Sequence, residues 1–189
     1  MAGEADYRVE RLSPERKADF FRLHGPEHGA DWCRCVAWWV AGWEGWGERT
    51  AEQNLALREG LFERGEMDGY LLFAGDEPAG WCQAALRERL PGLVHDFGGD
   101  PEPDVWAVAC FFLAPAQRGR GLARRLLEGV LADLRGRGAR RVEAYPRRAR
   151  KGEALDDMAV WNGRESLFRS LGFEVVGRNE RRLVMALEL

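Results

Sequence analysis

A turn rich in glycine and arginine is the place where residue types and spacing point most directly to chemistry. Residues 117–123 read Gln-Arg-Gly-Arg-Gly-Leu-Ala, and leucines recur at helical spacing after them. Glycine lets a backbone come close to a ligand, and the first N–H groups of a helix lack internal partners and carry the positive end of its dipole. The turn is therefore predicted to bind an anion, with Arg118 and Arg120 adding positive charge.

The segment before the turn indicates what positions it. Val105–Leu113 is an apolar run of β-branched and aromatic residues between Pro103 and Pro115, which favours a buried strand. Two nucleotide-binding patterns are excluded, because a dinucleotide turn would need a glycine at Arg124 and the Gly-Lys-Ser/Thr of a P-loop is absent. The remaining prediction is an anion-binding site of another kind, between a strand and an amphipathic helix.

Two motifs carry a family resemblance. In this context Arg118, Gly121 and Ala123 match Arg/Gln-x-x-Gly-x-Gly/Ala, so the turn resembles the acyl-CoA signature of the GNAT superfamily of N-acetyltransferases. Residues 167–173, Leu-Phe-Arg-Ser-Leu-Gly-Phe, are similar to the C-terminal element of that family, Leu-Tyr-x-x-x-Gly-Phe before a closing pair of strands. The predicted order of strands and helices also matches the family, so that the resemblance covers residues 5–189 in outline. Within the family, the chain looks like a member of a little-characterised bacterial branch.

The resemblance implies a fold and a reaction. The expected fold is α/β (α+β), with a mixed, mostly antiparallel central sheet that is flanked by helices and splayed between its fourth and fifth strands. Acetyl-CoA, the implied co-substrate, would lie in the gap, and the amine of a small molecule or peptide would attack its thioester directly. Such a reaction needs a base for the ammonium, donors for the oxyanion and an acid for the departing thiolate.

The resemblance also assigns cofactor-binding residues. The end of the central strand would offer backbone groups to the pantetheine arm, and the turn would take the pyrophosphate. The residues implied are Phe111, Phe112, Leu113, Arg118, Gly119, Arg120, Gly121, Leu122 and Ala123.

The chain departs from the family where the acid and the base are expected. Phe168 stands in place of the tyrosine that often acts as the acid. Trp161 replaces the asparagine seven residues earlier, with Asn162 one position later, and the run 105–113 carries no carboxylate. Cofactor binding is therefore better supported than catalysis.

Glu143 and Tyr145 are the predicted catalytic residues. They are two positions apart on a predicted strand, 141–145, and so share one face beside the expected gap. Tyr145 would protonate or orient the thiolate, and Glu143 would act as the base directly or through water. The alternative is that Glu143 is a solvated carboxylate and Tyr145 lies at the rim of the gap, without a catalytic role. Asp104 and Cys110 are then the next candidates for catalytic residues.

Residues 24–47 hold two histidines, two cysteines and five of the eight tryptophans. His24-x-x-x-His28 followed by Cys33-x-Cys35 supplies four possible zinc ligands. Cys-x-Cys is closer than the usual Cys-x-x-Cys, and free cysteine is also commonly buried. We predict no metal ligands and expect a packed aromatic loop or the wall of an acceptor pocket, keeping a metal role as an alternative.

The remaining elements follow from pattern. Strands are predicted at 7–12, 70–74, 79–86, 173–177 and 182–188, and helices at 13–23, 50–64, 166–171 and from 122 to a stop at Gly136 or Gly138. Residues 87–103 are predicted to be a long loop. It would bring acidic groups and a histidine towards the central strand, which would suit a cationic acceptor, whereas the tryptophans would suit an aromatic one. These residues are Glu88, His95, Asp96, Asp100 and Asp104.

Length and composition limit the classes of function. A chain of 189 residues, 46% hydrophobic and 31% charged, predicts one soluble domain over residues 1–189. A net charge of −3 argues against general nucleic-acid binding. With no apolar run of transmembrane length and no leader, we expect a cytoplasmic monomer or homodimer without a membrane partner, whose four cysteines are reduced.

Three functions remain open from the sequence. The first is an acyl-CoA-dependent N-acetyltransferase. The second is a module that binds or senses acyl-CoA without turning it over, because of Phe168 and the central strand without a carboxylate. The third is a metal-dependent role of the His/Cys cluster.

Overall fold

A single seven-stranded sheet forms the centre of the protein. The computed structural model describes residues 6–98, 102–149, 152–155 and 160–189. The strands are β1 (Tyr7–Arg11), β2 (Gly69–Ala74), β3 (Glu77–Leu86), β4 (Val105–Leu113), β5 (Arg141–Ala144), β6 (Glu174–Arg178) and β7 (Leu183–Glu188). Their order is β1-β2-β3-β4-β5-β7-β6, and β4–β5 is the parallel pair among antiparallel neighbours. The predicted mixed, mostly antiparallel sheet is confirmed.

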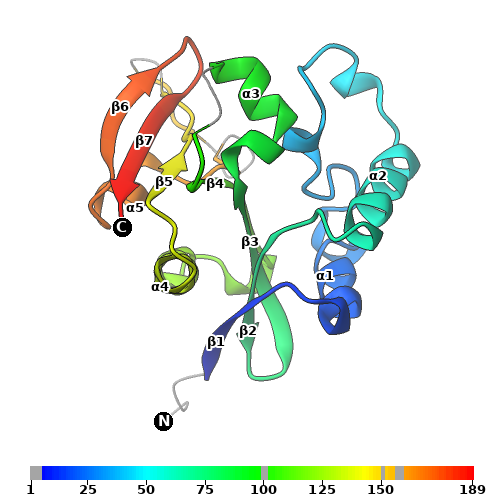
Figure 1. Cartoon of the computed structure of the whole chain (residues 1–189). Helices are drawn as coiled ribbons and strands as arrows, with labels where there is room; N and C mark the ends of the chain where they lie inside the picture. Colours follow the sequence, from blue (N-terminus) through cyan, green and yellow to red (C-terminus); the bar gives the residue numbers. More distant parts are fainter. Residues whose placement is uncertain (1–5, 99–101, 150–151, 156–159) are drawn as a thin grey trace.

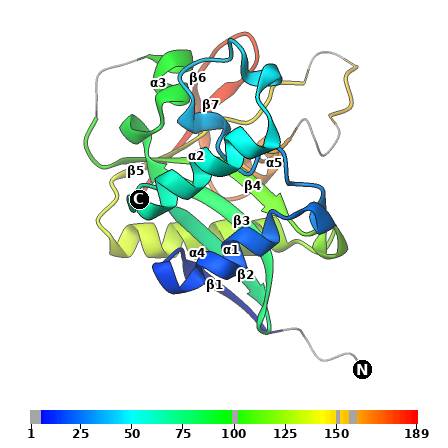
Figure 2. The same ribbon diagram turned by 90° about the vertical axis from the view of Figure 1, so that its right-hand side faces the viewer.

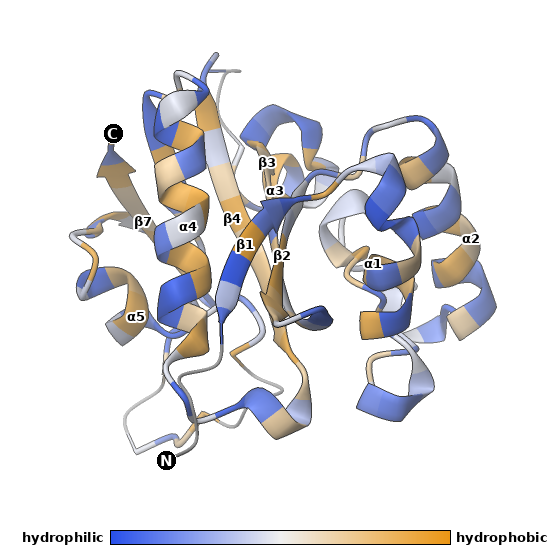
Figure 3. Cartoon of the chain, turned by 90° about the horizontal axis from the view of Figure 1, so that it is seen from below, coloured by the Kyte–Doolittle hydropathy of each residue, from blue (hydrophilic) through white to orange (hydrophobic). Residues whose placement is uncertain are grey.

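Helices cover both faces of this sheet. They are α1 (Lys17–Leu23), α2 (Ala51–Glu63), α3 (Pro91–Phe97), α4 (Leu122–Gly136) and α5 (Glu165–Arg169). The helix α4 lies on one face, and α1 and α2 lie on the other (Figures 1 and 3). Figure 2, turned by 90°, shows α1 and α2 in front of the sheet. No described helix is long and apolar enough to cross a membrane.

The helix α4 owes its position to an apolar stripe. Leu122, Leu126, Leu127, Val130, Leu131 and Leu134 are buried against the sheet, as helical spacing predicts. Gly129 lets α4 approach β1, because a Cβ there would lie 2.7 Å from Cβ of Val9. These contacts hold the N-terminus of α4 beside the end of β4.

The opposite face is aromatic. Phe20 and Leu23 of α1 pack on Trp81 of β3, and α2 covers α1. The helix α2 begins at Thr50 with a capping box, in which Thr50 and Gln53 satisfy each other's backbone N–H groups. This layer carries the segment 24–47, which wraps over it in short 3₁₀ turns.

The sheet opens between β4 and β5. The two strands pair only from Val105 to Val108 on β4, and β4 then continues to Leu113. A β-bulge interrupts β4 where Val108 and Cys110 pair with adjacent residues of β3, so that Ala109 is the extra residue. The splay predicted between the fourth and fifth strands is confirmed.

The prediction of a long loop at 87–103 was wrong in part, because this segment contains the helix α3. Pro91 occupies the first turn of the helix, where its missing N–H costs nothing. Leu93 is buried, and Gly92 packs so closely that a Cβ there would lie 2.9 Å from the Val40 carbonyl oxygen. Glycine and proline therefore serve close packing here. Asp100 lies outside the described residues.

Candidate active site

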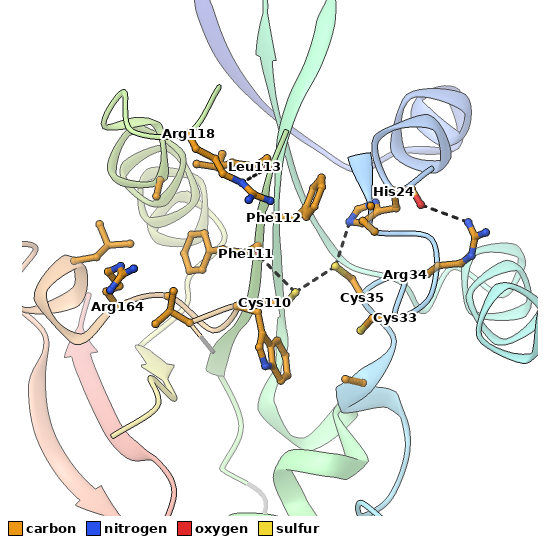
Figure 4. Close-up of a pocket in the computed structure, with 18 of the residues that line it drawn as sticks. His24, Cys33, Arg34, Cys35, Cys110, Phe111, Phe112, Leu113, Arg118 and Arg164 are labelled. Carbon is orange, nitrogen blue, oxygen red and sulfur yellow. Dashed lines mark hydrogen bonds between the residues drawn. The ribbon is translucent and has the colours of Figure 1, made fainter. Parts of the chain in front are cut away.

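A cavity of about 990 Å³ lies at the opening of the sheet. Its lining comes from four parts of the chain: residues 24–46, the end of β4 at 110–113, the turn and start of α4 at 118–124, and residues 160–170. Figure 4 shows Arg118 and Arg164 on one side, the end of β4 in the middle, and His24, Cys33 and Cys35 on the other side. Groups far apart in sequence therefore share one space.

The predicted anion-binding turn lies on this cavity. Gly119 and Gly121 have φ of 72° and 75°, a region that favours glycine, and a Cβ at either would meet no atom within 4 Å. Arg118 Nε donates to the Leu113 carbonyl at 3.2 Å, which fastens the turn to the end of β4. The exposed backbone at the mouth of α4 suits an anion.

Most of the predicted cofactor residues line the cavity. They are Phe111, Phe112, Leu113, Arg118, Gly119, Gly121 and Ala123. Arg120 is exposed and reaches Gln117 instead, whereas the side chain of Leu122 is buried in the core below α4. Binding of CoA by these residues stays a prediction.

The end of β4 is partly covered by a neighbouring segment. The Phe111 N–H donates to the Trp161 carbonyl at 2.7 Å, so this group is already occupied. Asn162 is fully buried, donates to the Ala109 carbonyl at 2.7 Å, and accepts a hydrogen bond from Arg182. Asn162 thus ties the segment to β4, across the place where the sheet opens.

Phe168 lies inside the protein. Its ring is fully buried and contacts Phe111 and Phe173. The position at which the resemblance expects an acidic tyrosine therefore contributes packing and offers no proton.

Glu143 and Tyr145 lie in another place. Tyr145 donates to Glu143 at 2.6 Å, which confirms that they share a face, and both line a second cavity of about 350 Å³. Arg87 and Arg141 pair with Glu143 at 3.3 and 3.1 Å. Burial, and then the Glu143 carboxylate, raise the pKa of Tyr145 well above its usual value. Among the described residues, the cavity lined by this pair and the cavity lined by the turn have no lining residue in common. The catalytic role of Glu143 and Tyr145 stays a prediction.

A buried cluster of sulfur and nitrogen stands on the wall of the first cavity. Cys35 Sγ lies 3.2 Å from Cys110 Sγ and 3.1 Å from His24 Nε2. The hydrogen bond with Cys110 holds the pKa of Cys35 well below its usual value, and the hydrogen bond with His24 and the charge of Arg58 act in the same direction. Burial raises the pKa of Cys33 to about 12, whereas the bond to Cys35 raises that of Cys110.

The sequence indicated only parts of this cluster. Cys110 was a further candidate catalytic residue and Cys35 a possible zinc ligand. No local sequence pattern predicts contact between two residues that are 75 positions apart. All four cysteines are free, in line with the prediction of reduced thiols. Among the described residues, no group of three or more His, Cys, Asp or Glu side chains is placed to hold a metal ion.

A large part of the wall of the first cavity is aromatic. Trp32, Trp43, Trp46 and Trp161 line it, and the described lining residues include no Asp or Glu. From the segment 87–104, Asp96 accepts a hydrogen bond from Trp43 Nε1 at 2.7 Å and lines the second cavity instead. The tryptophans, rather than the acids of that segment, therefore face the first cavity.

Solved structures with the same fold come from several organisms. An acetyltransferase from Thermus thermophilus is 21% identical, with 97% of each chain covered and a TM-score of 0.57. YncA of Salmonella typhimurium, solved with its cofactor acetyl-CoA, is 17% identical, covering 97% of this chain and 94% of its own (TM-score 0.56). The PaiA N-acetyltransferase of Thermoplasma acidophilum, solved with coenzyme A, is 13% identical, covering 97% and 99% (TM-score 0.57). At such identities the likeness shows the fold.

Sequence comparison gives the family. A search of curated proteins found no match. The model of the acetyltransferase (GNAT) family matches residues 30–152, which is more than half of the chain and includes β4, the turn and α4. The chain therefore belongs to the acetyltransferase (GNAT) family.

Proposed function

We propose that this protein transfers the acetyl group of acetyl-CoA to the amine of a small molecule or a peptide by direct attack on the thioester. The observation that carries the proposal is that the turn 118–123 and the end of β4 open into one cavity. The acetyl-CoA and coenzyme A in the YncA and PaiA structures support this choice of co-substrate. The pyrophosphate would lie on the turn and the pantetheine arm along Phe111–Leu113.

Acetyl-CoA binding is tested by the turn itself. Replacing Gly121 by valine puts a β-branched residue at φ 75°, where strain costs about 1–3 kcal/mol, and fills the space proposed for the pyrophosphate. We expect the Kd for acetyl-CoA, measured by calorimetry, to rise by about tenfold or more, equivalent to about 1.4 kcal/mol.

Gly65→Val is the matched control. Gly65 has φ 67° and is equally open, but it follows α2 and is not part of the described lining. It should cost similar stability and leave the Kd unchanged. Equal affinity of the Gly121→Val variant and the wild type would place the pyrophosphate elsewhere.

The lining predicts the class of acceptor. Four tryptophans and no described carboxylate favour an aromatic or apolar amine over a polycation. We expect kcat/KM for 2-phenylethylamine to exceed that for spermidine by at least about tenfold, measured as release of free CoA. A preference for spermidine would contradict this assignment.

A sensing module is the second candidate. Two observations favour it: Phe168 has no hydroxyl, and β4 carries no carboxylate. Acetyl-CoA would then raise the melting temperature, but no amine would release CoA from it. Turnover with any amine rules this candidate out.

Glu143 and Tyr145 remain the predicted base and acid, although they line the second cavity. Glu143→Gln and Tyr145→Phe test them. If both variants keep full turnover, Glu143 and Tyr145 are not catalytic, and the hydrogen bond between them has a structural role.

A further inference from the structure

A buried positive charge lies behind the cavity. Arg58 of α2 is fully buried, with its guanidinium carbon 3.8 and 4.3 Å from the ring centres of Phe20 and Phe21. Its Nε and Nη1 have no hydrogen-bond partner, and no carboxylate of the described residues pairs with it. Guanidinium keeps its proton at neutral pH, and a buried charge is costly unless an opposite charge lies nearby. Two nearby groups can supply a negative charge that raises the pKa of Arg58: Cys35, which has the larger effect, and Glu59.

The hydrogen bonds lead from Arg58 to Cys35. Arg58 Nη2 donates to the Phe20 carbonyl and lies 3.1 Å from His24 Nδ1. His24 Nδ1 also lies 3.0 Å from the Phe20 carbonyl oxygen, which already accepts from Arg58. Since a guanidinium can only donate, we assign Nδ1 as an acceptor and the ring proton to Nε2, which faces Cys35 Sγ at 3.1 Å. The Cys110 thiol lies 3.2 Å away on the other side. Cys35 Sγ thus receives two donors, as a thiolate requires.

The backbone holds Cys35 in place for this contact. Arg34 and Cys35 have φ of 50° and 57°, in the left-handed region that is strained for both residue types. The groups facing Cys35 are His24 at the end of α1, Arg58 of α2, Cys110 of β4 and the neighbouring Cys33. This strained, buried arrangement provides the anion that Arg58 needs.

The thiolate stands where the chemistry of the proposed reaction would occur. Cys35, Cys110 and His24 line the same cavity as the turn 118–123. Cys110 directly follows the bulge in β4, on the strand where the family's carboxylate was expected. The described lining residues include no Asp or Glu, and of the three cysteines that line the cavity Cys35 is the one whose pKa is lowered.

We propose that the Cys35 thiolate takes the proton from the acceptor ammonium, and that His24, Cys110 and Arg58 position it and keep it ionised. This assignment rests on the proposed acetyl transfer. The ammonium gives a proton to Cys35 Sγ, and the free amine attacks the acetyl carbonyl carbon. The bond from that carbon to the CoA sulfur then breaks, and the CoA thiolate takes the second proton of the attached nitrogen. Cys35 returns its proton to water, so amide, CoA and one proton are the products.

Activity against pH tests the base. In the proposed arrangement the thiolate is the form present at neutral pH, and because the pKa of Cys35 is lowered, this form is lost as pH falls through that lowered pKa. We expect wild-type kcat/KM to fall on the acid side there. Cys35→Ser should lower kcat by about 10² to 10⁴-fold and remove this acid limb, with the Kd for acetyl-CoA unchanged.

Cys82→Ala is the control for loss of a buried thiol. Cys82 lies in the core below α4 and outside the described lining, and it should keep the wild-type profile. Glu143→Gln in the same assay decides between the two candidate bases. Loss of the acid limb in Glu143→Gln, with Cys35→Ser unchanged, overturns the proposal.

The wild-type protein provides a test that needs no variant. Alkylation of Cys35 by iodoacetamide, followed by peptide mass spectrometry, should be as fast at pH 7 as at pH 9 and be slowed by bound CoA. A rate that rises only above about pH 8.5 would show an ordinary thiol and overturn the assignment even where turnover occurs. An acetyl group on Cys35 after acetyl-CoA alone would overturn it too, because the sulfur would then be the attacking atom. If no amine releases CoA, the acetyl transfer fails and the role of Cys35 fails with it.

Discussion

Replacing Arg58 by alanine is expected to lower the free energy of unfolding by about 3–5 kcal/mol, measured by urea denaturation at pH 7. The change removes a fully buried side chain that is stacked on Phe20 and Phe21, and it leaves a void between α1 and α2. It also removes the donor to the Phe20 carbonyl and to His24.

Arg58→Met separates packing from charge. Methionine fills much of the same space, and Cys35 can neutralise itself by taking up a proton once the guanidinium is gone. We therefore expect Arg58→Met to cost less than half as much as Arg58→Ala, while alkylation of Cys35 slows at pH 7. Fast alkylation of Cys35 in Arg58→Met would show that the guanidinium is not its counter-charge.

Gly163→Ala is expected to cost about 2–5 kcal/mol and to weaken acetyl-CoA binding. Gly163 has φ 88°, where alanine is strained by about 1–2 kcal/mol, and its Cβ would lie 2.8 Å from the Phe168 ring and 3.2 Å from the Phe111 ring. Overpacking adds about 1–3 kcal/mol. The clash would move the segment that binds the Phe111 N–H, and with it the cavity wall.

Gly75→Ala is the matched control for this prediction. Gly75 has φ 61° in the turn between β2 and β3, and a Cβ added there would meet no atom within 4 Å. It should show the strain alone, with unchanged affinity for acetyl-CoA. Equal stability of the two variants would mean that the rings move aside without cost.

The elements that position the cofactor site could be predicted because their signals are local. The strand at Val105–Leu113 has the predicted bounds, and the helix begins at Leu122 after the glycine turn. Apolar runs, helical spacing and glycine at positive φ each depend on a few neighbouring residues. The helix at 91–97 was missed because its glycine and proline are also typical of loops.

The surroundings of the proposed chemistry could not be predicted in the same way. That Glu143 and Tyr145 share a face follows from a spacing of two, but their cavity depends on where β5 ends. The contact of Cys35 with Cys110 depends on a left-handed backbone at Cys35 and a bulge at Ala109. Neither feature has a marker in the sequence, since both positions carry residues other than glycine.

The bulge at Ala109 decides which residues at the end of β4 can be substituted to alter each side of the strand. Beyond it, Phe111 and Leu113 pack on the α4 side, whereas Cys110 and Phe112 pack on the α1 side. Substitutions at 110 and 112 are therefore expected to change the side of the cavity proposed for the acceptor, and substitutions at 111 and 113 the side proposed for acetyl-CoA. With Ala109 kept but the bulge removed, strict alternation from Val108 would turn the Cys110 thiol towards α4 and exchange the two sets. One extra residue thus decides which side of the sheet each side chain at the end of β4 faces.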